Sequence, residues 1–430
     1  MKQLKIDELS RSVTAPMSES INFLNEVALD FPDAISFAAG RPYEGNFDLD
    51  LIHHYLDTYY AHSVDRQGGD EAAARREILQ YGRTKGIINE LVAENLRVDE
   101  GISVGPESIV VTVGCQEALT TTLMTLRREE SDAVLAVAPC YVGLYGAAEL
   151  AGIKVLEVGS GPHGVDLDDL ATTVREARGA GVRPKVLYLI PDFSNPSGIR
   201  MSRSDRESLM RLARELEILI IEDNPYGIFD DGETLPTLKS IDRHQQVIYL
   251  GTYAKTGIPG ARVGFVVADQ ELVLPEGRRG LLADQIAKIK GMVTVNTSPI
   301  AQAIIGGRLL TDGFDLRRSN RAEVDVYRRN RKHLLGCLAE RFPSSGTSGV
   351  TWNEPTGGLF CLVTLPFPAG DDLLRVSAEE FGVLWTPLHH FYADGRPRRE
   401  IRLSFSNLTE CQITEGIARL AAFVADQNQP

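Results

Sequence analysis

The feature that most constrains the fold of this chain is an alternation of short apolar runs with helical patterns between Ser108 and Phe265. The runs are rich in β-branched residues and almost continuously apolar, which is typical of strands buried on both faces of a parallel sheet. They are SIVVTVG, DAVLAVA, KVLYLIP, LEILIIED, VIYLGTY and VGFVVAD. This alternation predicts an α/β domain built around a largely parallel sheet.

The C-terminal third of the chain has a different pattern. A helical stretch over about residues 277–341 leads into antiparallel-looking strands and a closing amphipathic helix that begins near Thr409. A chain of 430 residues also exceeds one average domain. We therefore expect an N-terminal arm that joins the small domain (residues 1–45), a large domain (46–310), and a long linking helix with a small α+β domain (311–430).

Charge and cysteine usage exclude several classes of protein. A net charge of -14 opposes a broad nucleic-acid surface, because phosphate binding needs clustered Lys and Arg. The five cysteines have no ligand spacing, so we expect neither a disulfide framework nor a metal site. The N-terminus lacks the apolar core of a secretory signal and no window is long enough for a membrane span, so we expect a cytoplasmic protein without membrane contact.

Polar residues follow each apolar run, where the loops of an α/β sheet converge on a ligand. Lys255 ends a buried strand, and partial desolvation there lowers a lysine pKa and suits the amine to Schiff-base chemistry. The alternative is an ordinary surface lysine. Asp223 is either a turn former or a buried carboxylate for a protonated pyridine nitrogen. Asn195 is either a turn residue or a hydrogen-bond donor to a phenolate oxygen.

Three further positions fit an anionic, aromatic ligand. Gly114, Cys115 and Gln116 open a helix whose free N–H groups would cradle a phosphate. Arg262 lies within reach of the same place and could bind phosphate bidentately. Tyr141 could stack on a cofactor ring or be a half-buried structural tyrosine.

Three motifs in order, SNPSG, EDNPYG and AKTGIPGARVG, carry a specific resemblance. From about Ile35 to Phe405 the chain resembles the pyridoxal-5′-phosphate (PLP) aminotransferases of fold type I, class I/II, particularly the α-aminoadipate/kynurenine branch. The resemblance implies the PLP-transferase fold: a large domain with a mostly parallel seven-stranded sheet and a small α+β domain. It also implies PLP as cofactor and transfer of an amino group between an amino acid and a 2-oxo acid.

The same resemblance assigns roles around the cofactor ring. Lys255 would hold PLP as a Schiff base and then move a proton between the substrate Cα and the cofactor. Asp223 would pair with the pyridine nitrogen, and Tyr141 would stack on the ring. Asn195 and Tyr226 would bond the phenolate oxygen. Lys255, Asp223 and Tyr141 are thus the expected catalytic residues.

It also assigns the phosphate and substrate contacts. The implied phosphate ligands are Gly114, Cys115, Gln116, Thr252, Arg262 and, from a neighbouring subunit, Tyr81. A homodimer with shared active sites is therefore expected. Arg402 would clamp the substrate α-carboxylate with help from Asn195, and Gly40 would lie near the substrate.

The chain departs from the family pattern at two phosphate positions. Ala254 replaces a hydroxyl residue before the lysine, and Cys115 replaces Ser or Ala at the helix start. A lost hydrogen bond to a charged group costs roughly 1–3 kcal/mol, so we expect weaker cofactor binding with unchanged chemistry.

The substrate is less constrained. A loop near the substrate entrance carries His389 and His390, which are either satisfied polar residues or contacts to a polar or phenolic side chain. The chain is similar to aminotransferases of antibiotic pathways, so an aromatic or arylglycine substrate of the 3,5-dihydroxyphenylglycine type is expected. General aromatic or 2-aminoadipate transfer is the alternative.

Other activities stay open at this stage. A PLP lyase, decarboxylase or oxidase could use the same scaffold. A non-enzymatic regulator would need a DNA-binding module, for which about 34 residues precede the matching region. A nicotinamide-dependent dehydrogenase is disfavoured because no GxGxxG turn follows a first strand.

Overall fold

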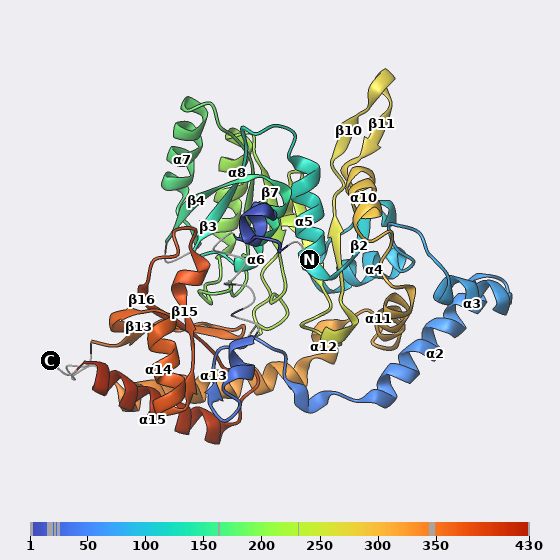
Figure 1. Ribbon diagram of the computed structural model, residues 1–430. Helices are drawn as coiled ribbons and strands as arrows, with labels where there is room; N and C mark the ends of the chain where they lie inside the picture. The colour runs from blue at the N-terminus through green and yellow to red at the C-terminus, as the bar shows by residue number, and fades with distance from the viewer. Residues whose placement is uncertain are drawn as a thin grey trace.

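The computed structural model describes residues 3–14, 20, 23, 26–161, 164–230, 232–343 and 349–428. Two sheets organise these residues (Figure 1). The larger sheet lies in the first two thirds of the chain, and the smaller one lies in the C-terminal third beside the N-terminal segment. The fold is the expected mixed α/β architecture.

The larger sheet has eight strands among the described residues, in the order β2-β9-β8-β7-β6-β3-β4-β5. Their bounds are β2 (Ile109–Val113), β3 (Asp132–Ala138), β4 (Lys154–Gly161), β5 (Gly164–Val165), β6 (Arg183–Leu189), β7 (Leu219–Asp223), β8 (Val247–Thr252) and β9 (Val263–Val267). Strands β8, β7, β6, β3 and β4 are mutually parallel, whereas β9 is antiparallel to both β2 and β8.

The prediction of a mostly parallel sheet is confirmed, with eight strands in place of seven. The additional strand is β5, a two-residue segment that pairs antiparallel with the end of β4. Two residues cannot form an apolar run, so the hydrophobic pattern holds no signal for this strand.

Helices cover both faces of the larger sheet. Side chains of successive strand residues point to opposite faces. In β6, Val186 and Tyr188 face the cluster that contains α5 (Gly114–Leu126) and α6 (Val142–Ala151). Leu187 and Leu189 face the cluster that contains α7 (Leu167–Gly179) and α8 (Arg203–Glu215). This two-sided burial explains why the strands are apolar on both faces along most of their length.

A third group of helices packs beyond the β2 edge of the sheet (Figure 1). It consists of α2 (Leu49–Arg66), α3 (Glu71–Leu79), α4 (Asn89–Glu100) and α11 (Pro299–Thr311), while α10 (Leu282–Val293) packs on α5. The short elements are η1 (Ile6–Glu8), η2 (Arg11–Val13), η3 (Glu44–Asn46), η4 (Pro106–Ser108), η5 (Pro259–Ala261), η6 (Pro275–Gly277), α9 (Leu238–Ile241), α12 (Leu316–Ser319) and the protruding hairpin of β10 (Glu271–Val273) and β11 (Arg279–Leu281).

The smaller sheet is four-stranded and antiparallel, in the order β12-β13-β16-β15. Its strands are β12 (Thr351–Trp352), β13 (Phe360–Ala369), β15 (Thr386–Pro387) and β16 (Arg398–Ser404). The neighbouring helices are α13 (Arg321–Arg341), α14 (Asp371–Phe381) and α15 (Glu410–Gln427), and η7 (Leu388–Phe391) follows β15.

The N-terminal segment joins this part of the molecule through β1 (Ile35–Ser36), which pairs in parallel with β14 (Val383–Leu384). The backbone N–H of Ser404 also donates to the carbonyl of Phe37. The domain boundaries at residues 45/46 and 310/311 stay a prediction. No helix in the described part of the chain has the length and apolar character of a membrane span.

Helices α2 and α11 approach each other closely because of Gly307. A Cβ at this buried position would collide with the backbone carbonyl of Tyr55 in α2. We therefore expect Gly307→Ala to destabilise the protein by on the order of 1–3 kcal/mol, because the helices must move apart.

Gly336 is the matched control, since it is an exposed helical glycine in α13, and no described atom outside its own helix lies within 4 Å of the position that a Cβ would take. Gly336→Ala should stabilise the protein by roughly 0.5–1 kcal/mol through helix propensity alone. Urea unfolding of both variants measures the difference. Equal effects of the two substitutions would contradict this account of the α2–α11 contact.

Candidate active site

The polar residues singled out in the sequence lie at the ends of neighbouring strands in the larger sheet. Asp223 is the last residue of β7, and Thr252 is the last residue of β8. Gly114 directly follows β2, which runs in the same direction as β8 because β9 is antiparallel to both. Lys255 follows β8 by three residues, and Asn195 lies in the loop after β6.

The amine of Lys255 is partly desolvated. Its Nζ donates to the carbonyl oxygen of Gly40 at 2.8 Å, which places the N-terminal segment directly against the lysine. Burial, together with the positive charges of Arg402 and Arg262, lowers the pKa of Lys255 to about 8. An appreciable fraction of the amine is therefore neutral near physiological pH, and a neutral amine is both a nucleophile and a base.

Asp223 is a buried carboxylate with 4% of its surface exposed. Its Oδ2 accepts from the hydroxyl of Tyr188 at 2.7 Å, and its Oδ1 accepts from the thiol of Cys115 at 3.4 Å. Burial raises the pKa of Asp223 to about 6, against the lowering effect of these two donors. No Lys or Arg in the described part of the chain forms an ion pair with Asp223.

Tyr188 is a site residue that the sequence analysis missed. It lies inside β6, one residue before the end of the strand, and its side chain faces the same layer as α5 and α6. The available signal is a tyrosine among the aliphatic residues at the end of the strand. Cys115 was predicted for its backbone alone, and its side chain also turns to Asp223.

The start of α5 forms a cradle with Arg262. Gly114 has a φ of +72°, and a Cβ there would collide with the guanidinium of Arg262. Gly264 allows β9 to pass close to the helix start, because a Cβ there would lie 2.7 Å from the backbone nitrogen of Cys115. A helix N-terminus beside an arginine is suited to bind an anion.

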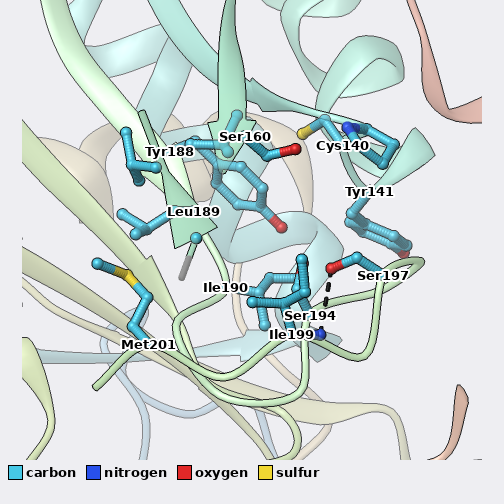
Figure 2. Close-up of a pocket in the computed structure, with 14 residues that line it drawn as sticks. Cys140, Tyr141, Ser160, Tyr188, Leu189, Ile190, Ser194, Ser197, Ile199 and Met201 are labelled. Carbon is cyan, nitrogen blue, oxygen red and sulfur yellow. Dashed lines mark hydrogen bonds between the residues drawn. The ribbon is translucent and has the colours of Figure 1, made fainter. Parts of the chain in front are cut away.

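Tyr141 is the N-cap residue of α6, beside this cradle. Its hydroxyl lies 3.5 Å from Oε1 of Gln116, whose Nε2 donates to the carbonyl of Gly143 at 2.7 Å. Burial and the negative charge of Asp223 raise the pKa of Tyr141, so the phenol stays neutral. Figure 2 shows Tyr141 and Tyr188 among the residues that line a small pocket.

Thr252, three residues before Lys255, forms a local hydrogen bond through its side chain. Its Oγ1 accepts from the backbone N–H of Ala254 at 3.1 Å. The side chain of Ala254 is a methyl group, so it cannot donate a hydrogen bond.

Arg402 is the second buried charge of the site, with 5% of its surface exposed. It donates to Oδ1 of Asn195 at 2.6 Å, to the carbonyl of Ala38 at 2.6 Å and to Oγ1 of Thr386 at 3.2 Å. Its Nε has no hydrogen-bond partner among the described residues, and no described carboxylate pairs with it. Burial lowers the pKa of Arg402 to about 10.

Aromatic rings surround this guanidinium. The centroids of Phe360 and Phe391 lie 4.5 and 5.1 Å from its Cζ. Tyr226 is buried and packs edge-to-face on Phe360 at 5.6 Å. Burial raises the pKa of Tyr226, which also hydrogen-bonds Asn195.

Three predicted positions lie apart from this group. Tyr81 is 83% exposed, and its described hydrogen bond is local, from its backbone N–H to Gln80. His389 and His390 do contact one polar partner, the carboxylate of Asp371 at the start of α14. That partner lies outside the group that holds Lys255 and Asp223.

The residues present fit a phosphorylated pyridine such as PLP. The unpaired carboxylate of Asp223 is complementary to a pyridinium, and the cradle at Gly114 is complementary to a phosphate. Lys255 supplies an amine of lowered pKa, and the unpaired guanidinium of Arg402 is complementary to a carboxylate. Leaving two such charges buried without counter-charges is costly, so the arrangement favours ligands that provide them.

Comparisons with known proteins agree with this chemistry. Residues 57–420 match the family model described as aminotransferase class I and II. A (S)-3,5-dihydroxyphenylglycine transaminase from Amycolatopsis orientalis is 48% identical to this chain over 422 residues, which cover 98% of this chain and 95% of the relative.

Two further similarities are more distant. A 2-aminoadipate transaminase from Thermus thermophilus is 31% identical over 397 residues, which cover 90% of this chain and 89% of the relative. A solved structure of a kynurenine aminotransferase from Pyrococcus horikoshii, in complex with PMP, superimposes with a TM-score of 0.81 at 28% identity and 98% coverage of both chains.

Because Asp223 is buried, its ionisation should lower the stability of the cofactor-free protein, and this effect should depend on pH. Its pKa rises from an ordinary 3.8 to about 6 on folding, so the cost of ionisation appears between about pH 4 and 6 and is constant above that window. Asp223→Asn should therefore stabilise the cofactor-free protein near pH 8 by on the order of 2–3 kcal/mol, and should have little effect near pH 4.

Thermal unfolding of PLP-free protein across this pH range measures the effect. Asp192→Asn is the contrasting control, because Asp192 is a buried carboxylate paired with Arg206 at 2.6 Å and Arg200 at 2.9 Å. Its replacement should destabilise the protein at pH 8. A loss of stability at pH 8 in the Asp223→Asn protein would show that Asp223 is compensated within the chain.

Proposed function

The chain belongs to the class I and II aminotransferase family, and from this membership we propose that it moves the amino group of an aromatic or arylglycine amino acid of the 3,5-dihydroxyphenylglycine type to a 2-oxo acid. It is a PLP-dependent transferase. The observation that carries the mechanism is the pair of buried charges of Asp223 and Arg402, neither of which has a described ion-pair partner, together with the buried amine of Lys255.

In this proposal each group of the site holds one part of the cofactor. Asp223 would hold the pyridine nitrogen, Asn195 and Tyr226 would hold the phenolate oxygen, and Tyr141 would cover the ring. The phosphate would be held by Gly114, Cys115, Gln116, Thr252 and Arg262. When bound, PLP supplies an electron-withdrawing ring that stabilises negative charge at the substrate Cα.

The protein groups then carry the proton and orient the substrate. Lys255 would hold the cofactor covalently, and its Nζ, as a free amine, would accept the Cα proton of the substrate. Tyr188 and Cys115 donate to Asp223 and hold its two oxygens in place, which favours the ionised carboxylate. The ionised carboxylate of Asp223 would keep the pyridine nitrogen of the cofactor protonated.

Arg402 acts on the substrate carboxylate. Its guanidinium is already fixed by Asn195, Ala38 and Thr386, and its Nε is available as a further donor. A carboxylate bound there would sit on the side of the site that Gly40 borders through its contact with Lys255.

The substrate proposal is supported by the 48% identity with the (S)-3,5-dihydroxyphenylglycine transaminase. A role in antibiotic biosynthesis stays a prediction. The aromatic rings of Phe360, Phe391 and Tyr226 around Arg402 are compatible with an aryl side chain next to the carboxylate. A second candidate, 2-aminoadipate transfer, is supported by the 31% identical relative. The cytoplasmic location stays a prediction.

A panel of amino donors and 2-oxo acids, read by product mass, tests this function. We expect 3,5-dihydroxyphenylglycine or a close arylglycine to give the highest kcat/KM, with one new amino acid formed for each 2-oxo acid consumed. The control is Lys255→Ala, which should retain PLP without a covalent link and form no product. A preference for 2-aminoadipate would support the second candidate, and more than one equivalent of product per active site without a 2-oxo acid acceptor would contradict transfer.

We further propose that the enzyme is a homodimer in which Tyr81 reaches the cofactor phosphate of the partner. Tyr81 projects into solvent, and its neighbour Gly82 lies against Pro299 at the start of α11. Large apolar side chains are also exposed in this region, at Met292, Val293, Val295 and Ile300. An exposed apolar surface of this kind is suited to a second copy of the chain.

The dimer proposal predicts a selective effect of Tyr81→Phe. Since Ala254 cannot donate to the phosphate, the lost hydroxyl should weaken PLP retention by roughly tenfold, about 1.4 kcal/mol. Turnover at saturating PLP should change little, because a phosphate contact is made equally in ground and transition states. Dialysis of the holoenzyme measures PLP retention, and sedimentation measures whether the enzyme is a monomer or a dimer. An active monomer, or unchanged retention in Tyr81→Phe, would refute the shared site.

A further inference from the structure

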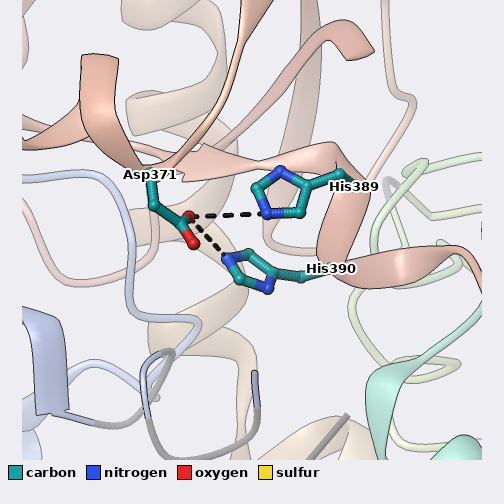
Figure 3. A group of neighbouring side chains, drawn as sticks. All are labelled: Asp371, His389 and His390. Atoms are coloured by element: carbon teal, nitrogen blue, oxygen red, sulfur yellow. Dashed lines mark hydrogen bonds and ion pairs between the residues drawn. The ribbon is translucent and has the colours of Figure 1, made fainter. Parts of the chain in front are cut away.

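Two adjacent histidines converge on one carboxylate at a site separate from the PLP residues. Nε2 of His390 lies 2.8 Å and Nε2 of His389 lies 3.6 Å from the same oxygen, Oδ1 of Asp371 (Figure 3). We propose that these three side chains bind one divalent transition-metal ion of the Zn²⁺ class.

The three side chains are close enough to share one ion. The three ligand atoms lie within 4.8 Å of one another. Bonds of about 2.0–2.1 Å in a tetrahedron place neighbouring ligand atoms roughly 3.3 Å apart, so modest side-chain movements complete the site. His389 and His390 are nearly fully buried, at 11% and 4% side-chain exposure, and therefore start from restricted positions.

The second ring nitrogen of His390 has the partner that metal-binding histidines need. Its Nδ1 lies 2.8 Å from the hydroxyl oxygen of Ser20, and the ring of Phe23 packs on the imidazole at 5.1 Å. When Nδ1–H donates to the hydroxyl, the lone pair of Nε2 is free to coordinate.

The nature of the donors selects the class of metal. Two imidazoles and one carboxylate are the ligand types that Zn²⁺ prefers among sites with no thiolate. Asp371 is 46% exposed on its side chain, so solvent can supply a fourth ligand. None of the five cysteines belongs to this site, so the spacing of the cysteines could not predict it.

The site connects elements that border the substrate region. Asp371 begins α14, and the two histidines belong to η7. The next residue, Phe391, packs 5.1 Å from the guanidinium of Arg402, and its carbonyl accepts from the backbone N–H of Cys140. A bound metal would fix η7 against α14 and would hold this wall of the substrate region in place.

Metal titration of tag-free, chelator-treated enzyme saturated with PLP tests the proposal. Zn²⁺ is titrated in competition with a chromophoric chelator, and Co²⁺ is followed by visible absorption. We expect one equivalent per chain and a rise in the thermal transition. Asp371→Asn and His389→Gln should each lower the affinity by at least about tenfold, the least seen for changes around metal ligands.

The matched control is His333→Ala. His333 lies near Thr414 and Cys337 on the far helix α13, so its loss should leave the affinity unchanged. Circular dichroism of the metal-free variants checks that they fold. Three results would overturn the proposal: no stoichiometric binding, binding unchanged in Asp371→Asn, or a Co²⁺ spectrum with thiolate character that His333→Ala removes.

Discussion

The rest of the site depends on two buried charges that the chain does not neutralise. Asp223 and Arg402 are each at least 95% buried, and neither has a described ion-pair partner. The hydrogen bonds from Tyr188 and Cys115 reduce the cost of the carboxylate without cancelling it, because its pKa still rises to about 6. Burying these two charges lowers the stability of the ligand-free protein. It also raises the affinity for a cation beside Asp223 and for an anion beside Arg402.

The two sheets each hold one of these charges in a fixed position. Asp223 lies at the end of β7, where the backbone is fixed by neighbours on both sides. Arg402 comes from the smaller sheet and is tied by Asn195 to the larger one and by Ala38 to the N-terminal segment. Lys255 is tied to that segment through Gly40. The N-terminal segment therefore couples the two sheets at the point where the substrate must lie.

Sequence patterns predicted the parts of this arrangement that have strong local signals. Continuous apolar runs predicted the buried strands, and the turn chemistry after them placed Asp223 and Lys255 at one edge. The side-chain partners were harder to predict, because a hydrogen bond such as Tyr188 to Asp223 joins residues 35 positions apart. The strand β5 has too few residues to leave a pattern, and the pairing of β1 with β14 depends on tertiary contacts.

The two departures from the family pattern have different physical consequences. Ala254 lacks the hydroxyl of the family pattern, and the hydroxyl oxygen of Thr252 accepts from the backbone N–H of Ala254. The region that would bind the phosphate therefore has fewer hydrogen-bond donors. Cys115 keeps its backbone N–H at the helix start and adds a thiol that donates to Asp223. Burial and the carboxylate raise the pKa of this thiol, which keeps it protonated and therefore a donor. The substitution thus adds a hydrogen bond to Asp223 at the position where the family pattern would put a hydroxyl or a methyl group.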